Sequence, residues 1–175
     1  MMLLLLCCCI SGPQEKETSA QKEEAPLIQN NLQEKVNAVN QRFCGNIPTE
    51  LILGYHPDGK RIEVEKVERS GSLTQCTIKL FHGDREYDFW EGHLSAWKAN
   101  TDKPFWQYNP ERNPAMYHKV TEFGDQAVYL AGPRQLMIFE DGIVYSVVPP
   151  SSGSISSSGK EIKELALEMA RHYKL

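Results

Sequence analysis

The 175-residue chain lacks the short motifs that mark the common catalytic and cofactor sites. No two histidines stand four residues apart, as helical zinc motifs require, and no G-x-S-x-G sequence supplies the nucleophile of an α/β hydrolase. The segment 153–161 resembles a phosphate-binding loop only in part, because five residues separate Gly153 from Gly159 and Glu161 replaces the required hydroxyl. We therefore predict a protein that is not an enzyme and that binds neither a cofactor nor a metal ion.

The chain also lacks an excess of basic charge. It contains 19 Lys and Arg residues against 23 Asp and Glu residues, for a net charge of −4, and has no block of like charge. Proteins that bind nucleic acid attract phosphate through clustered basic side chains. Nucleic acid is therefore not an expected partner.

No apolar run approaches the length of about 20 residues that crosses a bilayer. The N-terminal run Leu3–Leu6 is followed by three cysteines, and it reaches only to Ile10 if these thiols count as apolar. A short apolar core of this kind is typical of a secretory signal peptide, although no Lys or Arg precedes it. We interpret residues 1–9 as a signal peptide and lipid-attachment region.

The three cysteines resemble the lipid-attachment site of bacterial lipoproteins, in which a small residue precedes the modified cysteine and a leucine stands a little further back. Cys8 follows Leu5 and Cys7, and Cys9 follows Leu6 and Cys8. The resemblance implies a lipid anchor on Cys8 or Cys9, and hence an extracytoplasmic protein held at the cell membrane of a bacterial envelope. Two alternatives stay open: a cleaved signal with incidental cysteines, and palmitoylation on the cytoplasmic face.

Residues 10–26 have the composition of a tether. Pro, Gln, Glu, Lys, Ser and Ala predominate and no aromatic residue occurs, so the segment cannot bury enough apolar surface to offset its ordering entropy. As a disordered coil it would span about 20–25 Å. Residues 27–175 are of the right length for a single domain with its own core.

Cys44 and Cys76 are the only cysteines beyond the N-terminal cluster. In an oxidising compartment, two lone cysteines most simply form one disulfide. The alternative is a pair of buried thiols that do not react. A metal site would need further ligands, and no histidine stands at ligand spacing from either cysteine.

The periodicity of apolar residues predicts an α+β domain. Steps of three and four residues predict helices at 27–43 and 161–173. Alternation predicts strands at 61–69 and 73–81, and Glu140-Asp-Gly predicts a hairpin turn between strands 135–139 and 143–148. We expect a mainly antiparallel sheet of about five strands, packed against the N-terminal and C-terminal helices.

Residues 84–99 fit two patterns. Tyr87, Trp90, Leu94 and Trp97 form a stripe at helical spacing, with Asp84 placed to cap the first turn. A strand is the alternative, because residues 82–84 could turn a hairpin. We favour an additional helix at 85–98.

The arrangement resembles that of uncharacterised cell-envelope lipoproteins of actinobacterial type, in which a small α+β domain with one cysteine pair follows a lipidated cysteine and a polar tether. This likeness depends on short segments spread over residues 43–173. They are Cys44 with residues 48–54, Cys76-Thr-Ile, Gly124-Asp-Gln-Ala, the hairpin 136–148, and the last helix with Leu165-Ala166. The resemblance implies a location and a fold, but no activity.

The aromatic residues point to a binding surface. Residues 100–116 contain three prolines and are predicted to form a long loop, and all three tryptophans fall between Trp90 and Trp106. Long loops in compact domains are often functional, and aromatic side chains dominate binding energy. We predict that Phe105, Trp106, Tyr108 and Arg112 bind a ligand or partner, which could be a protein, a peptide or a glycan. Alternatively, Trp106 fastens the loop to the sheet.

The sequence therefore predicts a lipid-anchored extracytoplasmic protein with a small non-catalytic binding or interaction domain. A secreted or envelope hydrolase is an alternative, and it would require a cleft that joins His82, His93 or His118 to a carboxylate and a nucleophile. A purely structural envelope protein would need neither feature and would present an apolar patch to a neighbour.

Overall fold

The described part of the domain consists of one seven-stranded antiparallel sheet and three helices. The computed structural model describes residues 21–69 and 73–175, so Cys8, Cys9 and residues 10–20 of the expected tether lie outside the described residues. The elements are α1 (Gln21–Gly45), α2 (Thr49–Tyr55), β1 (Arg61–Arg69), β2 (Leu73–Phe81), β3 (Phe89–Lys98), β4 (Tyr117–Val120), β5 (Gln126–Leu130), β6 (Gln135–Glu140), β7 (Ile143–Val148) and α3 (Ile162–Tyr173). The expected α+β class with an antiparallel sheet is confirmed, with seven strands in place of about five.

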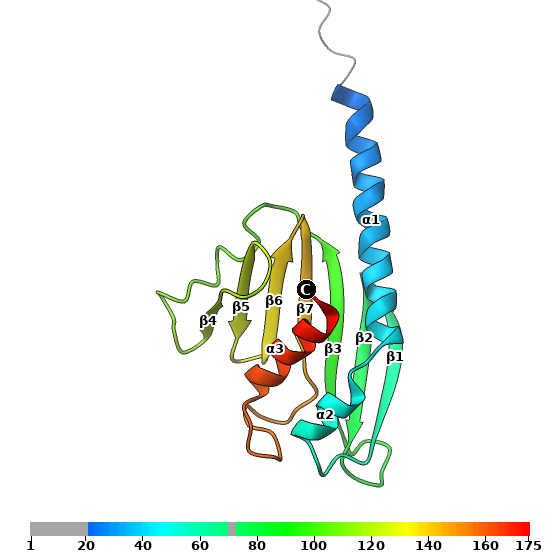
Figure 1. Cartoon of the computed structure of the whole chain (residues 1–175), viewed down its shortest axis with the longest axis vertical. Helices are drawn as coiled ribbons and strands as arrows, with labels where there is room; N and C mark the ends of the chain where they lie inside the picture. Colours follow the sequence, from blue (N-terminus) through cyan, green and yellow to red (C-terminus); the bar gives the residue numbers. More distant parts are fainter. Residues whose placement is uncertain (1–20, 70–72) are drawn as a thin grey trace, which may run out of the picture.

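The strand order is β1-β2-β3-β7-β6-β5-β4, and every neighbouring pair is antiparallel. Two meanders meet where β3 pairs with β7, so these two strands lie at the centre and β1 and β4 form the edges. The helices cover one face of the sheet: α1 packs on β3 and β2, and α3 packs on β6 and β7 (Figure 1). The main core lies between these helices and the sheet.

The expected helix at 85–98 is wrong, because Phe89–Lys98 forms strand β3 in the interior of the sheet. Leu94 and Ala96 point into the main core, whereas Ser95 pairs with Gln75 and Ser146 on the other face. At Gly92 a Cβ atom would lie 2.4 Å from the nitrogen of Pro150, so this strand position requires glycine. Pairing with β2 and β7 supplies hydrogen bonds that a local pattern cannot reveal, and this tertiary context outweighs the helical spacing.

Helix α1 extends beyond the sheet at its N-terminal end (Figure 1). It begins at Gln21, six residues before the expected start, so the last part of the expected tether is helical. Leu32 lies near the β6–β7 turn at the end of the sheet, because a Cβ on Gly142 would lie 3.4 Å from its side chain. The residues before Leu32 therefore form a helical stalk on the domain.

Two contacts fasten the packed half of α1 to the sheet. Asn40 is buried, and its side-chain amide donates to the Ala96 carbonyl (2.9 Å) and accepts from the Ala96 N–H (2.7 Å). The pairing of β3 with β2 ends at Ser95, so Ala96 has no residue of β2 opposite it. The Asn40 side chain forms the hydrogen bonds that a β2 residue would otherwise form. At the end of α1, Cys44 lies at disulfide distance from Cys76 of β2, with Cα atoms 5.3 Å apart.

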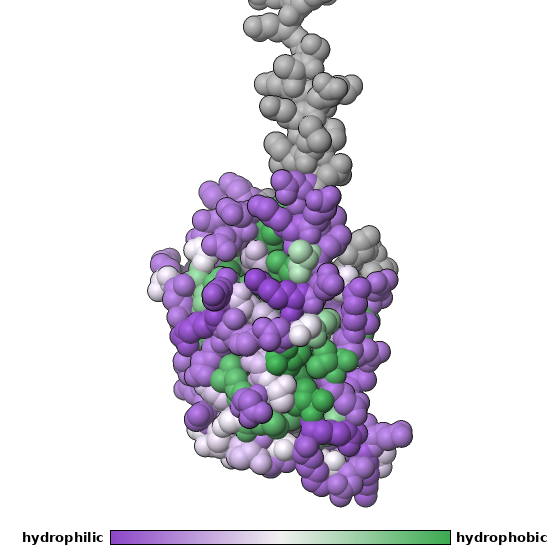
Figure 2. Space-filling model, turned by 45° about the vertical axis from the view of Figure 1, so that its right-hand side comes forward, coloured by the Kyte–Doolittle hydropathy of each residue, from purple (hydrophilic) through white to green (hydrophobic). Residues whose placement is uncertain are grey.

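Edge strand β1 is less well covered than the rest of the helix-side face. Val64 exposes 42% of its surface and Ile62 is half-buried, because the helices pack mainly on other strands. Figure 2, in which the β1 side of the molecule is turned forward, shows apolar surface in its lower half. The other residues from Arg61 to Glu68 are the half-buried Val67 and five charged residues, which are all exposed.

Candidate functional site

The long loop 99–116 leaves the end of β3 and returns to the sheet at β4. It is built from successive turns without a helix or strand, as predicted. Its start is held by the Ala99 N–H, which donates to the Gly142 carbonyl (2.8 Å). Its middle is organised by Asn109, whose side-chain oxygen accepts from the Glu111 N–H (2.8 Å) and whose carbonyl accepts from Arg112 and Asn113. These bonds give the loop a defined conformation.

The loop covers a second apolar cluster on the face of the sheet opposite the helices. Phe105 is 7% exposed and packs with Val128, Leu130 and other apolar residues of β5, β6 and β7. Tyr108 is half-buried against the same cluster, and its ring contacts that of Tyr117 with a centroid distance of 5.5 Å. Phe105 is thus the residue that anchors the loop to the sheet.

Trp106 points away from this cluster. It exposes 77% of its surface, so it does not fasten the loop to the sheet. Arg112 is also exposed. The other two tryptophans are half-buried: Trp97 packs against the second cluster and Trp90 against the main core.

A cleft of about 520 Å³ lies between the loop and the β4–β5 hairpin. Its apolar walls include Phe105 and Tyr108 from the loop and Phe123 from the β4–β5 turn. Phe105 belongs to the second cluster and Phe123 to the main core, so the cleft lies where the sheet ends and both faces meet. The volume is within the range of about 300–1,000 Å³ that small-ligand pockets occupy.

The rim of the cleft is polar and carries both signs of charge. Glu111, Asp125 and Lys119 line it together with Asn109 and Thr121. Within the part of the chain that the structure describes, none of these three charged side chains takes part in an ion pair. A few polar and charged groups that converge on an apolar cavity are the usual features of a binding site.

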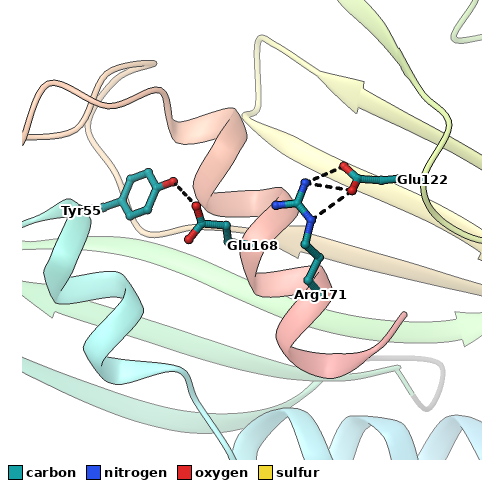
Figure 3. A network of polar contacts seen from close by, with 4 residues as sticks. All are labelled: Tyr55, Glu122, Glu168 and Arg171. Atoms are coloured by element: carbon teal, nitrogen blue, oxygen red, sulfur yellow. Dashed lines mark hydrogen bonds and ion pairs between the residues drawn. The ribbon is translucent and has the colours of Figure 1, made fainter.

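Helix α3 holds the β4–β5 turn in place (Figure 3). The Arg171 guanidinium donates to both carboxylate oxygens of Glu122, at 2.9 Å each, and Glu122 lies between two residues that line the cleft. On the other side of α3, the Tyr55 hydroxyl donates to Glu168 (2.9 Å). Burial, reinforced by this hydrogen bond, raises the pKa of Tyr55 to about 12. The helix thus connects the wall of the cleft to α2.

The histidines lie outside the cleft. The His82 and His56 rings lie on Trp90, at centroid distances of 4.6 and 5.1 Å, and His118 contacts Tyr129 at 5.8 Å. None of the five histidines lines the cleft. Among the described residues, no group of three His, Cys, Asp or Glu side chains is placed to hold a metal ion.

His56 makes the stability of the domain sensitive to acid. It is 1% exposed, and neither ring nitrogen has a hydrogen-bond partner among the described residues. Burial lowers the pKa of His56 below 6.5, and the Asp58 charge and the Pro150 main chain oppose this shift only in part. The unfolded chain therefore binds a proton more readily than the folded one, and this contribution to stability is present above pH 6.5 and lost as the pH falls below it.

We expect His56→Leu to flatten the dependence of the free energy of unfolding on pH below about pH 6.5. One proton accounts for a slope of at most about 1.4 kcal/mol per pH unit. Urea unfolding at intervals from pH 7.5 to 5 measures this slope. The control is His172→Gln, because His172 is exposed. Equal slopes in the wild type and His56→Leu would contradict the prediction.

The structure brings only part of the predicted binding set together. Phe105 and Tyr108 line the cleft, whereas Trp106 and Arg112 do not. Sequence reasoning missed Lys119, Phe123 and Asp125, which form the opposite wall and rim. The only signal in that region was Gly124-Asp125, a turn sequence, and it does not indicate that the turn faces the loop.

Comparisons of the chain with protein-family models, with curated proteins and with solved structures found no match. None of the described helices combines the length and the apolar character needed to cross a membrane. The candidate site is therefore defined by its geometry: an aromatic cleft with a polar rim, closed on one side by loop 99–116.

Proposed function

We propose that this protein is a membrane-anchored extracytoplasmic lipoprotein whose domain binds a ligand or partner, without catalysis, in the cleft between loop 99–116 and the β4–β5 hairpin. The observation that carries the proposal is the composition of that cleft. Its apolar walls are built by residues from three segments, and its rim groups Glu111, Asp125 and Lys119 have no ionic partners among the described residues.

Two features support the extracytoplasmic location. Cys44 and Cys76 lie at disulfide distance, which suits an oxidising compartment. The helical stalk of α1 extends beyond the sheet (Figure 1), and in the chain it follows the segment in which Cys8 or Cys9 was predicted to carry the lipid. In this arrangement the stalk holds the domain away from the membrane.

The non-catalytic function is supported by the lining of the cleft, which includes none of the histidines. A His-dependent hydrolase needs a histidine, a carboxylate and a nucleophile within hydrogen-bond reach of one another. The carboxylates that line the cleft are Glu111 and Asp125, whereas His82 and His118 contact Trp90 and Tyr129 instead. A binding domain requires only the cleft itself.

A thermal-shift screen of the full chain tests the proposal. The probes are pools of linear hexapeptides, together with cellotetraose and chitotetraose. We expect at least one class to raise the melting temperature, and Tyr108→Ala to weaken its binding about tenfold in calorimetry because a wall of the cleft is lost. Since Tyr108 is half-buried, this variant should also lose about 2 kcal/mol of stability and remain folded.

The matched control is Tyr87→Ala, because Tyr87 is an aromatic residue that is 71% exposed on a different loop. It should bind as the wild type does. Trp106→Ala should leave the free energy of unfolding within about 0.5 kcal/mol of the wild type, because its side chain is exposed. Binding that survives Tyr108→Ala would place the site elsewhere, and cleavage of a probe, detected by mass spectrometry, would favour the hydrolase.

A further inference from the structure

The main chain of β4 presents open hydrogen-bonding groups to the cleft. The Ala131 N–H donates to the Met116 carbonyl (2.9 Å), which makes residues 116 and 131 a hydrogen-bonded pair of the antiparallel ladder. Such pairs alternate with pairs whose N–H and C=O groups point outwards. In the register of β4 and β5, Tyr117 and Lys119 are therefore the residues that direct these groups away from β5.

Only part of this outer edge is occupied. The Tyr117 N–H donates to the Asn113 carbonyl of the loop (3.0 Å), as an outward-pointing group should. No hydrogen bond from the described residues reaches the outward N–H and C=O of Lys119. Lys119, Val120 and Thr121 all line the cleft, so this open stretch of edge lies along its length.

The opposite edge of the sheet is protected in a way that β4 is not. Strand β1 carries six charged residues among its nine, and those from Arg61 to Glu68 are exposed. Charged side chains on an edge strand oppose pairing with another chain. Strand β4 has the sequence Tyr-His-Lys-Val and only one Lys among its four residues. The edge that opens on the cleft is thus the one without this protection.

We propose that the cleft binds an extended peptide segment that carries a basic side chain and pairs with β4 as an additional strand. One residue of the peptide exchanges two main-chain hydrogen bonds with Lys119, and successive side chains of the peptide alternate between Phe105 and Tyr108 on one face and Phe123 on the other. Glu111 and Asp125, unpaired within the described structure, attract the basic side chain. This inference rests on the proposed function and gives the ligand a chemical class.

A glycan fits the same cleft less well. Sugar rings bind by stacking on exposed aromatic faces, and Phe105 and Phe123 are only 7% and 6% exposed. The one aromatic side chain of the loop with a largely free surface, Trp106, does not line the cleft. Buried aromatic walls beside an open strand edge favour small apolar side chains on an extended main chain.

The decisive comparison is between Lys119→Pro and Lys119→Ala. Proline removes the outward N–H and places its ring on the edge, but it removes no bond to β5, because this N–H points away from the ladder. Alanine removes the same charged side chain and keeps the N–H. The full chain and both variants are screened against a phage-displayed library of random linear heptapeptides, and the selected peptides are synthesised for calorimetry.

We expect the selected peptides to be enriched in Lys or Arg. Lys119→Ala is the reference that lacks the same side chain, and Lys119→Pro should bind the peptides at least about tenfold more weakly than Lys119→Ala, since the outward N–H donor is lost and the proline ring obstructs the approach of the peptide main chain. N-methylation of alternate peptide residues should weaken binding to the wild type by a similar factor, and this measurement serves if Lys119→Pro fails to fold. Glu111→Gln combined with Asp125→Asn should remove the preference for basic residues.

The inference would be overturned if the peptides bound Lys119→Pro as tightly as Lys119→Ala and if N-methylated peptides bound the wild type as tightly as the unmodified ones. Binding of cellotetraose or chitotetraose that depends on Tyr108 but not on the Lys119 N–H would also overturn it, while the proposed binding function would stand. If neither peptides nor these oligosaccharides bind, the inference and the proposed function both fail.

Discussion

Replacing Asn40 with alanine is expected to lower the free energy of unfolding by about 3–5 kcal/mol. The N–H and C=O of Ala96 are both buried in the sheet, and the variant removes the side chain that hydrogen-bonds them. The Asn40 side chain is 2% exposed and bonds both the N–H and the C=O of Ala96. Each unsatisfied buried group costs about 1–3 kcal/mol. Small domains have only about 5–15 kcal/mol of stability in total, so chemical denaturation should detect the loss easily.

Two further variants separate the hydrogen bonds from other effects. Asn37→Ala, one turn earlier on α1, removes an exposed amide that accepts a hydrogen bond from Gln33 and should change stability by less than about 0.5 kcal/mol. Asn40→Asp keeps the shape but cannot donate to the Ala96 carbonyl while ionised. Its stability should recover in part as the pH falls and the new carboxyl is protonated. A loss below about 1 kcal/mol in Asn40→Ala would mean that Ala96 finds other partners.

The sequence predicted those elements whose conformation is set by residues close together in the chain. The β6–β7 hairpin is the clearest example, because Asp141 and Gly142 have φ values of 51° and 78°, as a two-residue type I′ turn requires. The sequence Asp-Gly is typical of that turn, and β7 has the predicted bounds 143–148. The apolar stripe also predicted the buried face of α1 correctly, since Val36 and Phe43 are buried.

The error at β3 shows where such reasoning stops. Trp90, Leu94 and Trp97 have helical spacing, but their environment is set by β2 and β7, which are distant in the sequence. Only the pairing of three strands reveals that Gly92 is needed to let Pro150 approach. The binding loop is a similar case. Its aromatic residues were visible, whereas its opposite wall depends on β4 being an edge strand.

Reduction of the Cys44–Cys76 pair is expected to lower the free energy of unfolding by about 3–4 kcal/mol. The two cysteines are 32 residues apart, and on the chain-entropy model a cross-link over a loop of that size restricts the unfolded chain by about this amount. Comparing oxidised with reduced wild-type protein in urea leaves every side chain in place. Cys44→Ala combined with Cys76→Ala should be insensitive to the reductant.

The same cysteine pair links stability to location, because a disulfide persists only in an oxidising compartment. The intact mass of protein purified from its native host measures both properties. We expect a mass that lacks the signal segment, carries an acyl adduct at Cys8 or Cys9, and is lower by two hydrogens for the Cys44–Cys76 bond. An unmodified full-length mass with free thiols would contradict the pairing and the proposed anchor together. The proposed peptide ligand would then have to be sought in the cytoplasm, because β4 lies at the opposite side of the sheet from β2, which carries Cys76.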